Sequence, residues 1–242
     1  MSLRARTVLW TAVVFALAWS FARADQLYSV TGDDRYSIGT ALDRADIAYA
    51  GTERLSIVRQ GHMRRYVAVV TYTRSDEAGK AIVHARFVQE LESNGDLVDR
   101  TDADPDFLTV LNQPFAVQLD PTTMGDLRRL RGEVPFKAVS PLGGAQLVGF
   151  LRSAGSGIVG GMAAVGVRFE ADGPMSGSLP EHPGATLAGR MHVDGTAYYR
   201  SRDALLLALD ATLTIDGSLR GDHDASIPVR ITYHRKIAPL GR

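Results

Sequence analysis

In the stretch LAGRMHVDGTAYY, residues 187–199, apolar or small side chains alternate with polar ones from Gly189 onward. A period of two places successive side chains on opposite faces of an extended strand. The apolar series is Leu187, Gly189, Met191, Val193, Gly195, Ala197 and Tyr199, and the polar series is Arg190, His192, Asp194, Thr196 and Tyr198. The pattern predicts a β-strand with one buried face and one exposed face.

The same alternation recurs on both sides of this stretch, in residues 165–172, 205–216 and 227–234. The connections 200–203 and 217–226 are short and rich in Gly, Asp and Ser, so successive strands should be antiparallel neighbours. Strands of this length exceed the usual five or six residues, and sheets built from them coil. We therefore expect a strongly curved antiparallel meander over the second half of the chain.

The first half shows the same pattern less clearly. Candidate strands occupy residues 47–59, 65–74 and 81–91, with polar turns between them, and residues 97–100 and 115–119 are shorter candidates. The predicted fold class is mainly β, with α+β as the alternative. The sheet would form a half-barrel or a sandwich and carry one or two short helices.

One helix is predicted in DPTTMGDLRRLRG, residues 120–132. Asp120 is a good N-cap, Pro121 suits the first helical position, and Gly132 is a stop signal. The apolar residues at helical spacing are Met124, Leu127 and Leu130.

The first 24 residues have the pattern of a secretory signal peptide. Arg4 and Arg6 precede an uncharged, mostly apolar run over residues 7–22, and the segment closes on an Ala-Arg-Ala cleavage site. An uncleaved anchor is the alternative, but this run is short for a span of about 20 residues. We expect cleavage after residue 24, no membrane span thereafter, and one β-rich domain over residues 25–242, with a soft boundary near residues 132–161 as the alternative.

Composition narrows the environment and the partners. The chain has no cysteine, so it has neither disulfides nor a lipid-modified cysteine. Removing residues 1–24 takes away three of the 27 basic residues and none of the 27 acidic ones, so the net charge becomes about −3. Nucleic-acid binding needs a basic surplus and is not expected. The preference for arginine over lysine is typical of GC-rich bacteria, which favours a periplasmic or secreted bacterial protein.

Two motif-like stretches do not predict a cofactor or a calcium ion. Gly155-x-Gly157-x-x-Gly160 outlines a dinucleotide-binding turn, but only about ten residues separate its last glycine from Glu170, and further glycines disfavour the required helix. We interpret the stretch as a flexible crossing into a strand. Asp102-x-Asp104-x-Asp106 lacks the glycine and glutamate that complete a calcium loop, so it is interpreted as an acidic turn. No cofactor is predicted.

A row of two carboxylates and an imidazole is the sharpest chemical hypothesis. In a simple register of the last three strands, Asp194 lies beside Asp210, and Asp210 lies beside His234. Such a row could ligate a divalent metal or do acid and base chemistry. The favoured alternative is a solvated face with cross-strand charge pairs, so these three residues are candidate metal ligands only. The chain contains no compact catalytic signature, and an enzyme is not the favoured class.

Three functions remain open. A long coiled sheet must cover its apolar face with a second sheet, a helix or an apolar ligand, so an exported binding module for an apolar or lipid-like molecule is preferred. The second is a periplasmic structural or interaction domain that meets another envelope protein. The third is a metal-dependent hydrolase that uses Asp194, Asp210 and His234.

Overall fold

Eleven strands and one helix make up the described part of the chain. The computed structural model describes residues 24–39, 43–92, 97–101, 108–111, 117–129, 133–139, 146–178, 184–220 and 226–240. The elements are β1 (Ala24–Ile38), β2 (Asp43–Gln60), β3 (Met63–Asp76), β4 (Gly79–Glu92), β5 (Leu97–Thr101), α1 (Pro121–Arg129), β6 (Glu133–Val139), β7 (Gln146–Val159), β8 (Met162–Ser178), β9 (Thr186–Arg200), β10 (Leu206–Arg220) and β11 (Ser226–Pro239).

All eleven strands belong to one sheet, in the order β5-β4-β3-β2-β1-β11-β10-β9-β8-β7-β6. Every pair of neighbours is antiparallel. Within each arm of the sheet neighbours are consecutive in sequence, and the two arms are joined by the pairing of β1 with β11. Among the described residues the outer strands β5 and β6 do not pair with each other, so the sheet is open. The predicted mainly β fold with a curved antiparallel meander is confirmed.

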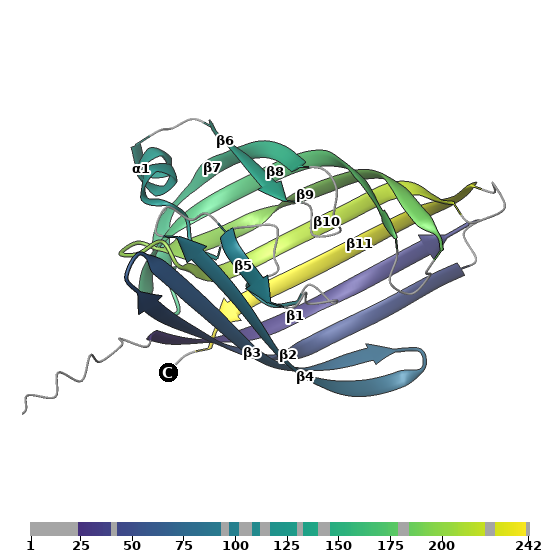
Figure 1. Ribbon diagram of the computed structural model, residues 1–242, viewed down its shortest axis with the longest axis horizontal. Helices are drawn as coiled ribbons and strands as arrows, with labels where there is room; N and C mark the ends of the chain where they lie inside the picture. The colour runs from purple at the N-terminus through teal and green to yellow at the C-terminus, as the bar shows by residue number, and fades with distance from the viewer. Residues whose placement is uncertain are drawn as a thin grey trace, which may run out of the picture.

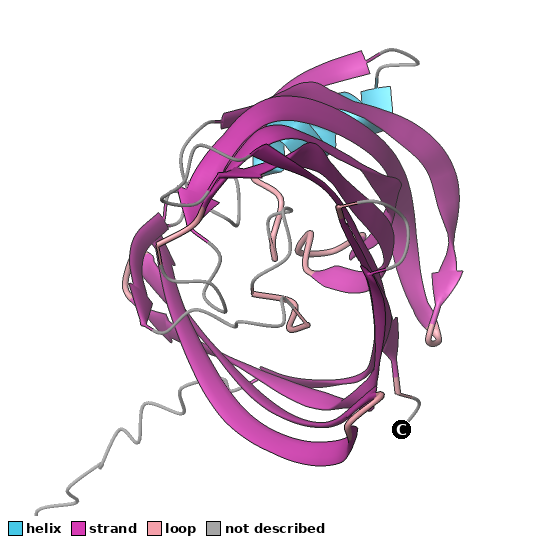
Figure 2. Cartoon of the chain, turned by 90° about the vertical axis from the view of Figure 1, so that its right-hand side faces the viewer, coloured by secondary structure: helices cyan, strands magenta, loops and turns pink. Residues whose placement is uncertain are grey.

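The sheet is strongly curved, with its long strands side by side around a central space (Figure 1). Seen from the end, it surrounds several loop segments (Figure 2). Its concave face carries the apolar series of the long strands, and among these side chains Met191 and Val193 of β9 are fully buried. Residues 108–111 and 117–119 contribute buried side chains to the same hydrophobic cluster. A chain segment from between β5 and α1 therefore covers part of the concave face.

The predicted helix is present as α1, and its capping is confirmed. The Asp120 carboxylate accepts a hydrogen bond of 2.9 Å from the amide of Thr123, which is the N-cap interaction. Met124 and Leu127 are buried at helical spacing. Leu130 and the stop signal at Gly132 lie outside the described residues. Within the described part of the chain, no helix is long and apolar enough to cross a membrane.

The prediction of a flexible crossing over residues 154–161 is wrong. Residues 146–159 form β7, and Gly160 and Gly161 make a two-residue turn into β8 with φ angles of 54° and 75°. A Gly-Gly pair suits such a turn, because both central residues of a type I′ hairpin need a positive φ. The small residues before this turn concealed the strand, since they carry little apolar alternation.

Strands β1 and β6 were not predicted either. In β1 the series that faces the core contains Gly32 and Asp34, so the apolar alternation is interrupted. The buried Asp34 carboxylate lies 2.5 Å from the guanidinium of Arg235 on β11 and accepts a hydrogen bond of 2.8 Å from the hydroxyl of Tyr49. Gly32 makes room for this pair, because a Cβ there would come within 3.0 Å of the Arg235 guanidinium. The buried Asp34, whose charge is balanced by Arg235, thus stands at a position where the alternating pattern requires an apolar side chain.

Some expectations fall outside the described residues. These are the signal peptide, since residues 1–23 are not described, the acidic motif at 102–107, and Phe115 of the short strand candidate. Residues 97–101 form β5, whereas Gln118 makes only an isolated bridge to Leu205.

Candidate functional site

The turn between β9 and β10 is the structural centre of the candidate site. The amide of Arg200 donates to the carbonyl of Leu205, and the amide of Ala204 donates to the carbonyl of Arg200, both at 2.8 Å. Ala204 adopts a positive φ of 56°, which is rare for a residue with a Cβ and costs about 1 kcal/mol. The surrounding hydrogen bonds therefore hold this turn in a conformation that the local sequence does not favour.

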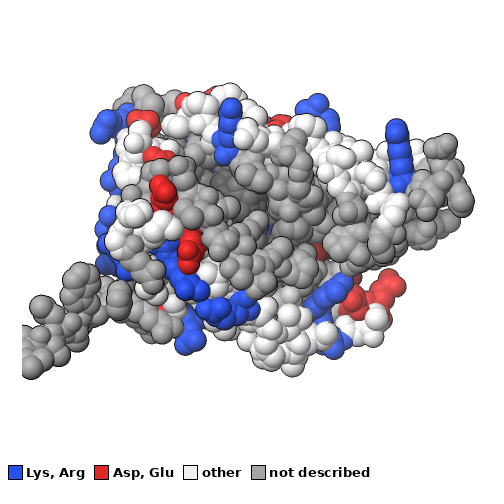
Figure 3. All heavy atoms as spheres, in the orientation of Figure 1, with Lys and Arg blue, Asp and Glu red and all other residues white. Residues whose placement is uncertain are grey.

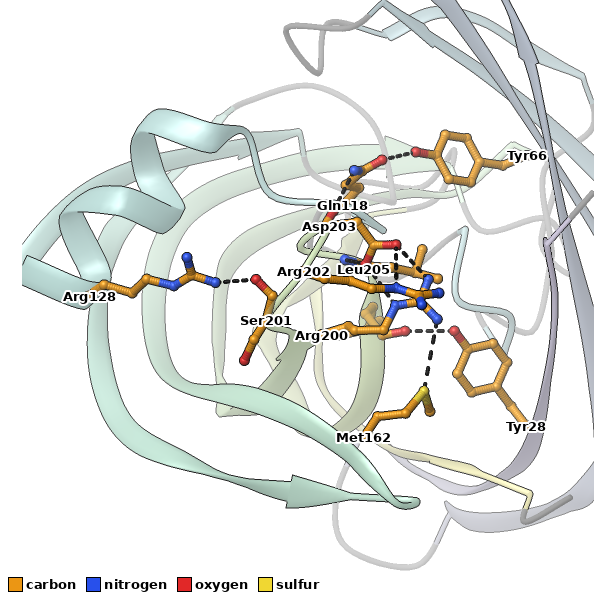
Figure 4. Close-up of polar contacts among 11 residues, drawn as sticks. Tyr28, Tyr66, Gln118, Arg128, Met162, Arg200, Ser201, Arg202, Asp203 and Leu205 are labelled. Atoms are coloured by element: carbon orange, nitrogen blue, oxygen red, sulfur yellow. Dashed lines mark hydrogen bonds and ion pairs between the residues drawn. The ribbon is translucent and has the colours of Figure 1, made fainter. Parts of the chain in front are cut away.

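A two-point ion pair fixes the turn from within (Figure 4). The Nε and Nη2 atoms of Arg200 lie 2.7 and 2.8 Å from the two carboxylate oxygens of Asp203. The side chains are 10% and 25% exposed, so solvent screens this pair little. Burial alone would raise the pKa of Asp203, but the hydrogen bonds and charge of Arg200, together with the Leu205 amide and Arg202, hold that pKa below its usual value of 3.8. Asp203 is therefore a carboxylate at neutral pH.

Hydrogen bonds to backbone atoms of this turn connect it to three other parts of the chain. The amide of Ser201 donates to the carbonyl of Ala163 on β8 at 2.8 Å. The amide of Leu206 donates to the carbonyl of Val117 at 2.9 Å. A guanidinium nitrogen of Arg128, in the last turn of α1, donates to the carbonyl of Ser201 (Figure 4). The turn is thus hydrogen-bonded both to α1 and to the beginning of β8.

Two buried tyrosines join the opposite arm of the sheet to the same turn. The hydroxyl of Tyr28 on β1 donates to the carbonyl of Leu206 at 2.6 Å. Tyr66 on β3 donates to the side-chain oxygen of Gln118, whose amide nitrogen donates to the carbonyl of Asp203 at 2.6 Å. Burial raises the pKa of Tyr28 and of Tyr66, so both phenols keep the protons that they donate.

A pocket of about 750 Å³ opens beside this network. Its lining residues are of three kinds, which are the arginines Arg128, Arg200 and Arg202, the serines Ser153, Ser156 and Ser201, and the apolar Met162, Ala163 and Val165. Val165 also belongs to the buried core, so the pocket reaches the concave face of the sheet. Basic side chains are visible along the edge of the molecule near α1 (Figure 3). The pocket thus brings arginine and serine residues next to an apolar surface.

The sequence located the elements of this site without identifying it. Residues 200–203 were predicted only as a polar connection, and residues 154–161 only as a flexible crossing into the strand that begins near residue 165. Arg128 lay within the predicted helix. The signal that could have found the site is the dense basic run Arg200, Arg202 next to Asp203 in a short connection.

The predicted register of the Asp194, Asp210 and His234 row is wrong by two residues. Asp194 and His234 are both opposite Thr212, and Asp210 is opposite Thr196 and Lys236. A bulge after Leu206 shifts the first pairing, and β10 continues through the residues predicted as the second turn.

The observed register still brings two of the three residues into contact. His234 Nε2 lies 3.0 Å from an Asp210 carboxylate oxygen, and its Nδ1 lies 3.9 Å from Asp33. Asp194 lies instead beside His192, at 3.7 Å. The role of Asp194, Asp210 and His234 as metal ligands stays a prediction.

Another set of side chains on the convex face has the spacing of metal ligands. One ligand atom from each of Glu170, Asp172 and His192 lies within 4.8 Å of the other two. Asp172 and His192 are cross-strand partners whose side chains are 3.0 Å apart. The residues are exposed or half-buried, and exposed groups of this kind also occur as ordinary cross-strand charge pairs. These residues could hold a divalent ion, although the sequence did not single them out.

Comparison with known proteins leaves the family open. No protein-family model matches the chain, and no curated protein matches it. The similar solved structures include one of lipovitellin that concerns lipid–protein interactions, with a TM-score of 0.44 and 10% identity over 90% of this chain. Another is a DUF1329 family protein from Desulfovibrio piger, with a TM-score of 0.17 and 7% identity over 89% of this chain and 86% of that chain. The chain spans about a quarter of the lipovitellin chain.

Proposed function

We propose that this protein is an exported β-rich module that binds an apolar or lipid-like molecule. The observation that carries the proposal is the pocket beside the β9–β10 turn. Its volume of about 750 Å³ lies within the range of pockets for small ligands. Met162, Ala163 and Val165 supply an apolar wall, and Val165 links that wall to the core of the sheet.

The construction of the pocket also favours binding. The elements around it are held by the Arg200–Asp203 ion pair and by the hydrogen bonds of Ser201, so the wall is largely formed before a ligand arrives. A preformed pocket avoids part of the entropy that binding would otherwise cost. The export component of the proposal depends on the signal-peptide pattern of the first 24 residues.

Native mass spectrometry of the untagged protein, purified from its own host, tests the proposal directly. We expect an additional mass of lipid-like size that organic extraction removes. Titration calorimetry of the extracted protein with decanol should then show saturable binding. A protein that carries no such mass and does not bind decanol would support the alternative of a structural or interaction domain.

A pair of matched variants tests whether the ligand occupies this pocket. Ala163→Trp places a large side chain in the pocket wall and should lower decanol affinity by about tenfold or more. Ile82→Trp places the same side chain at a site on β4 that is 69% exposed, and should bind decanol like the unmodified protein. Equal affinities in the two variants would place the ligand elsewhere.

A further inference from the structure

We infer that the ligand is an anionic amphiphile, whose carboxylate or phosphate lies between Arg128 and Arg202 while its chain follows the apolar wall. The inference rests on the proposed binding function and specifies the chemistry of the ligand. It follows from the charges that line the pocket, from the way one of them is compensated, and from the donors that the others offer.

The described lining of the pocket has an excess of positive charge. Its nine residues include three arginines and no acid. Asp203 is adjacent and compensates Arg200, because its carboxylate accepts both the Nε and the Nη2 hydrogen bonds of that guanidinium. Arg128 and Arg202 remain as the cations that can attract an anion to the pocket.

Arg128 and Arg202 have donors for such an anion. A guanidinium has five N–H donors, and the contact with the Ser201 carbonyl occupies one of those of Arg128. Arg202 is 72% exposed, and its Nε is 3.5 Å from Asp203, which already pairs with Arg200 more closely. Arginine is suited to a carboxylate or a phosphate because two parallel N–H groups can bind two oxygens of the anion.

The position of the apolar wall explains why the anion should carry a chain. Met162 and Ala163 begin β8 directly after the β7–β8 turn, and the Ser201 amide bonds to the Ala163 carbonyl. The apolar wall and the basic turn are therefore adjacent. An amphiphile would satisfy both parts of the pocket, whereas a small inorganic anion would leave the apolar part unfilled.

Titration calorimetry with four probes tests the inference. Decanoate and decyl phosphate carry an anion and a chain, decanol carries the same chain without charge, and inorganic phosphate has no chain. We expect both anionic probes to bind about tenfold more tightly than decanol, since two exposed guanidinium groups contribute up to about fivefold each. This advantage should shrink when salt is raised from about 0.05 M to about 0.5 M.

Arg202→Gln should lower decanoate affinity by about fivefold and leave decanol affinity unchanged. Arg230→Gln is the matched control, because Arg230 is 68% exposed and also lies 3.5 Å from an aspartate, on the distant β10–β11 pair. The control should bind both probes like the unmodified protein.

The outcomes separate this inference from the proposed function. Equal affinities for decanol and decanoate would overturn the anionic preference while the binding function stands. Failure of every decyl probe to bind would overturn both. Inorganic phosphate that binds as tightly as decyl phosphate would show a plain anion site and would overturn the amphiphile. An equal loss of decanoate affinity in the two glutamine variants would assign the effect to overall charge and contradict the role of Arg202.

Discussion

Asp203 contributes both to the stability of the fold and to the position of Arg200 in the pocket lining. Its carboxylate pairs with Arg200, and its backbone carbonyl accepts the Gln118 hydrogen bond that leads to Tyr66. The charge of this one residue therefore orders a buried cation, and its backbone joins the two arms of the sheet. Loss of the charge should affect the side-chain pair but leave the backbone contact in place.

We predict that Asp203→Asn lowers the free energy of unfolding by about 2 kcal/mol at neutral pH, because the Arg200 guanidinium loses its ionic partner. The folded-state pKa of Asp203 lies below 3.8, so the contribution is fully present above about pH 4 and is lost as the pH falls through the folded-state value. Urea unfolding from about pH 7 to about pH 2.5 should show the difference between the two proteins shrinking only at the acidic end. Asp216→Asn, whose side chain is 62% exposed, should show a much smaller difference, and equal effects would contradict the prediction.

Residue-level geometry was the least predictable part of the site. The turn at residues 200–203 was expected, but the alternation does not reveal that Arg200 bends back onto Asp203, because this depends on side-chain angles. The same limit applies to the buried pair of Asp34 and Arg235. The two strands that carry these opposite charges are neighbours in the sheet but lie far apart in the sequence. When the alternation of each strand is considered separately, Asp34 and Arg235 are both predicted to be exposed, because they are charged.

At the scale of elements, α1 connects the covering segment to the pocket. It begins after the Asp120 cap, buries Met124 and Leu127, and carries Arg128 of the pocket lining in its last turn. The cap was predictable because it depends on residues adjacent in sequence. The position of α1 over the pocket was not, because it depends on a contact with Ser201, more than 70 residues away.

We predict that Asp120→Ala lowers the free energy of unfolding by about 1 kcal/mol, since the Thr123 amide loses its acceptor. It should also weaken decanoate binding, because a frayed α1 positions Arg128 less well. Urea unfolding and decanoate titration measure the two effects. Asp126→Ala removes a carboxylate from the interior of the same helix and should leave stability within about 0.5 kcal/mol of the unmodified protein. A similar loss in both variants would indicate a general charge effect instead of a cap.

The strands show where sequence patterns work and where they fail. Strands β8 to β11 were predicted because their concave side chains are large and apolar while their convex ones are polar. Strand β7 was missed, and the small side chains near its end give no alternation. The bulge after Leu206 shifts the β9–β10 pairing by one residue, and a bulge leaves no period in the sequence. The β10–β11 pairing was missed because β10 continues to Arg220, through residues predicted as the second turn.

At the scale of the whole molecule, protection from solvent should follow the order of the sheet. β1 is paired with β2 over its whole length and with β11 from Tyr28 onward. Residues 153–159 of β7 pair with β8 on one side, and in the described structure β6 covers the other side only as far as Arg152. We predict that amide hydrogen exchange is slowest in β1 and β11 and much faster in residues 153–159. Exchange of β1 at the rate of this β7 segment would show that the joint between the two arms opens first.

The joint between β1 and β11 has a mechanical consequence. The beginning of β1 and the end of β11 lie side by side at one end of the sheet. There Tyr28 is opposite Pro239, and the Leu240 amide donates a hydrogen bond to the Leu27 carbonyl. A stretching force applied to Ala24 and Leu240 would break the hydrogen-bonded residue pairs between β1 and β11 one after another, instead of shearing all of them together. The two arms should therefore separate at low tension in an optical trap, even though we expect amide exchange to be slowest at the same β1–β11 pairing.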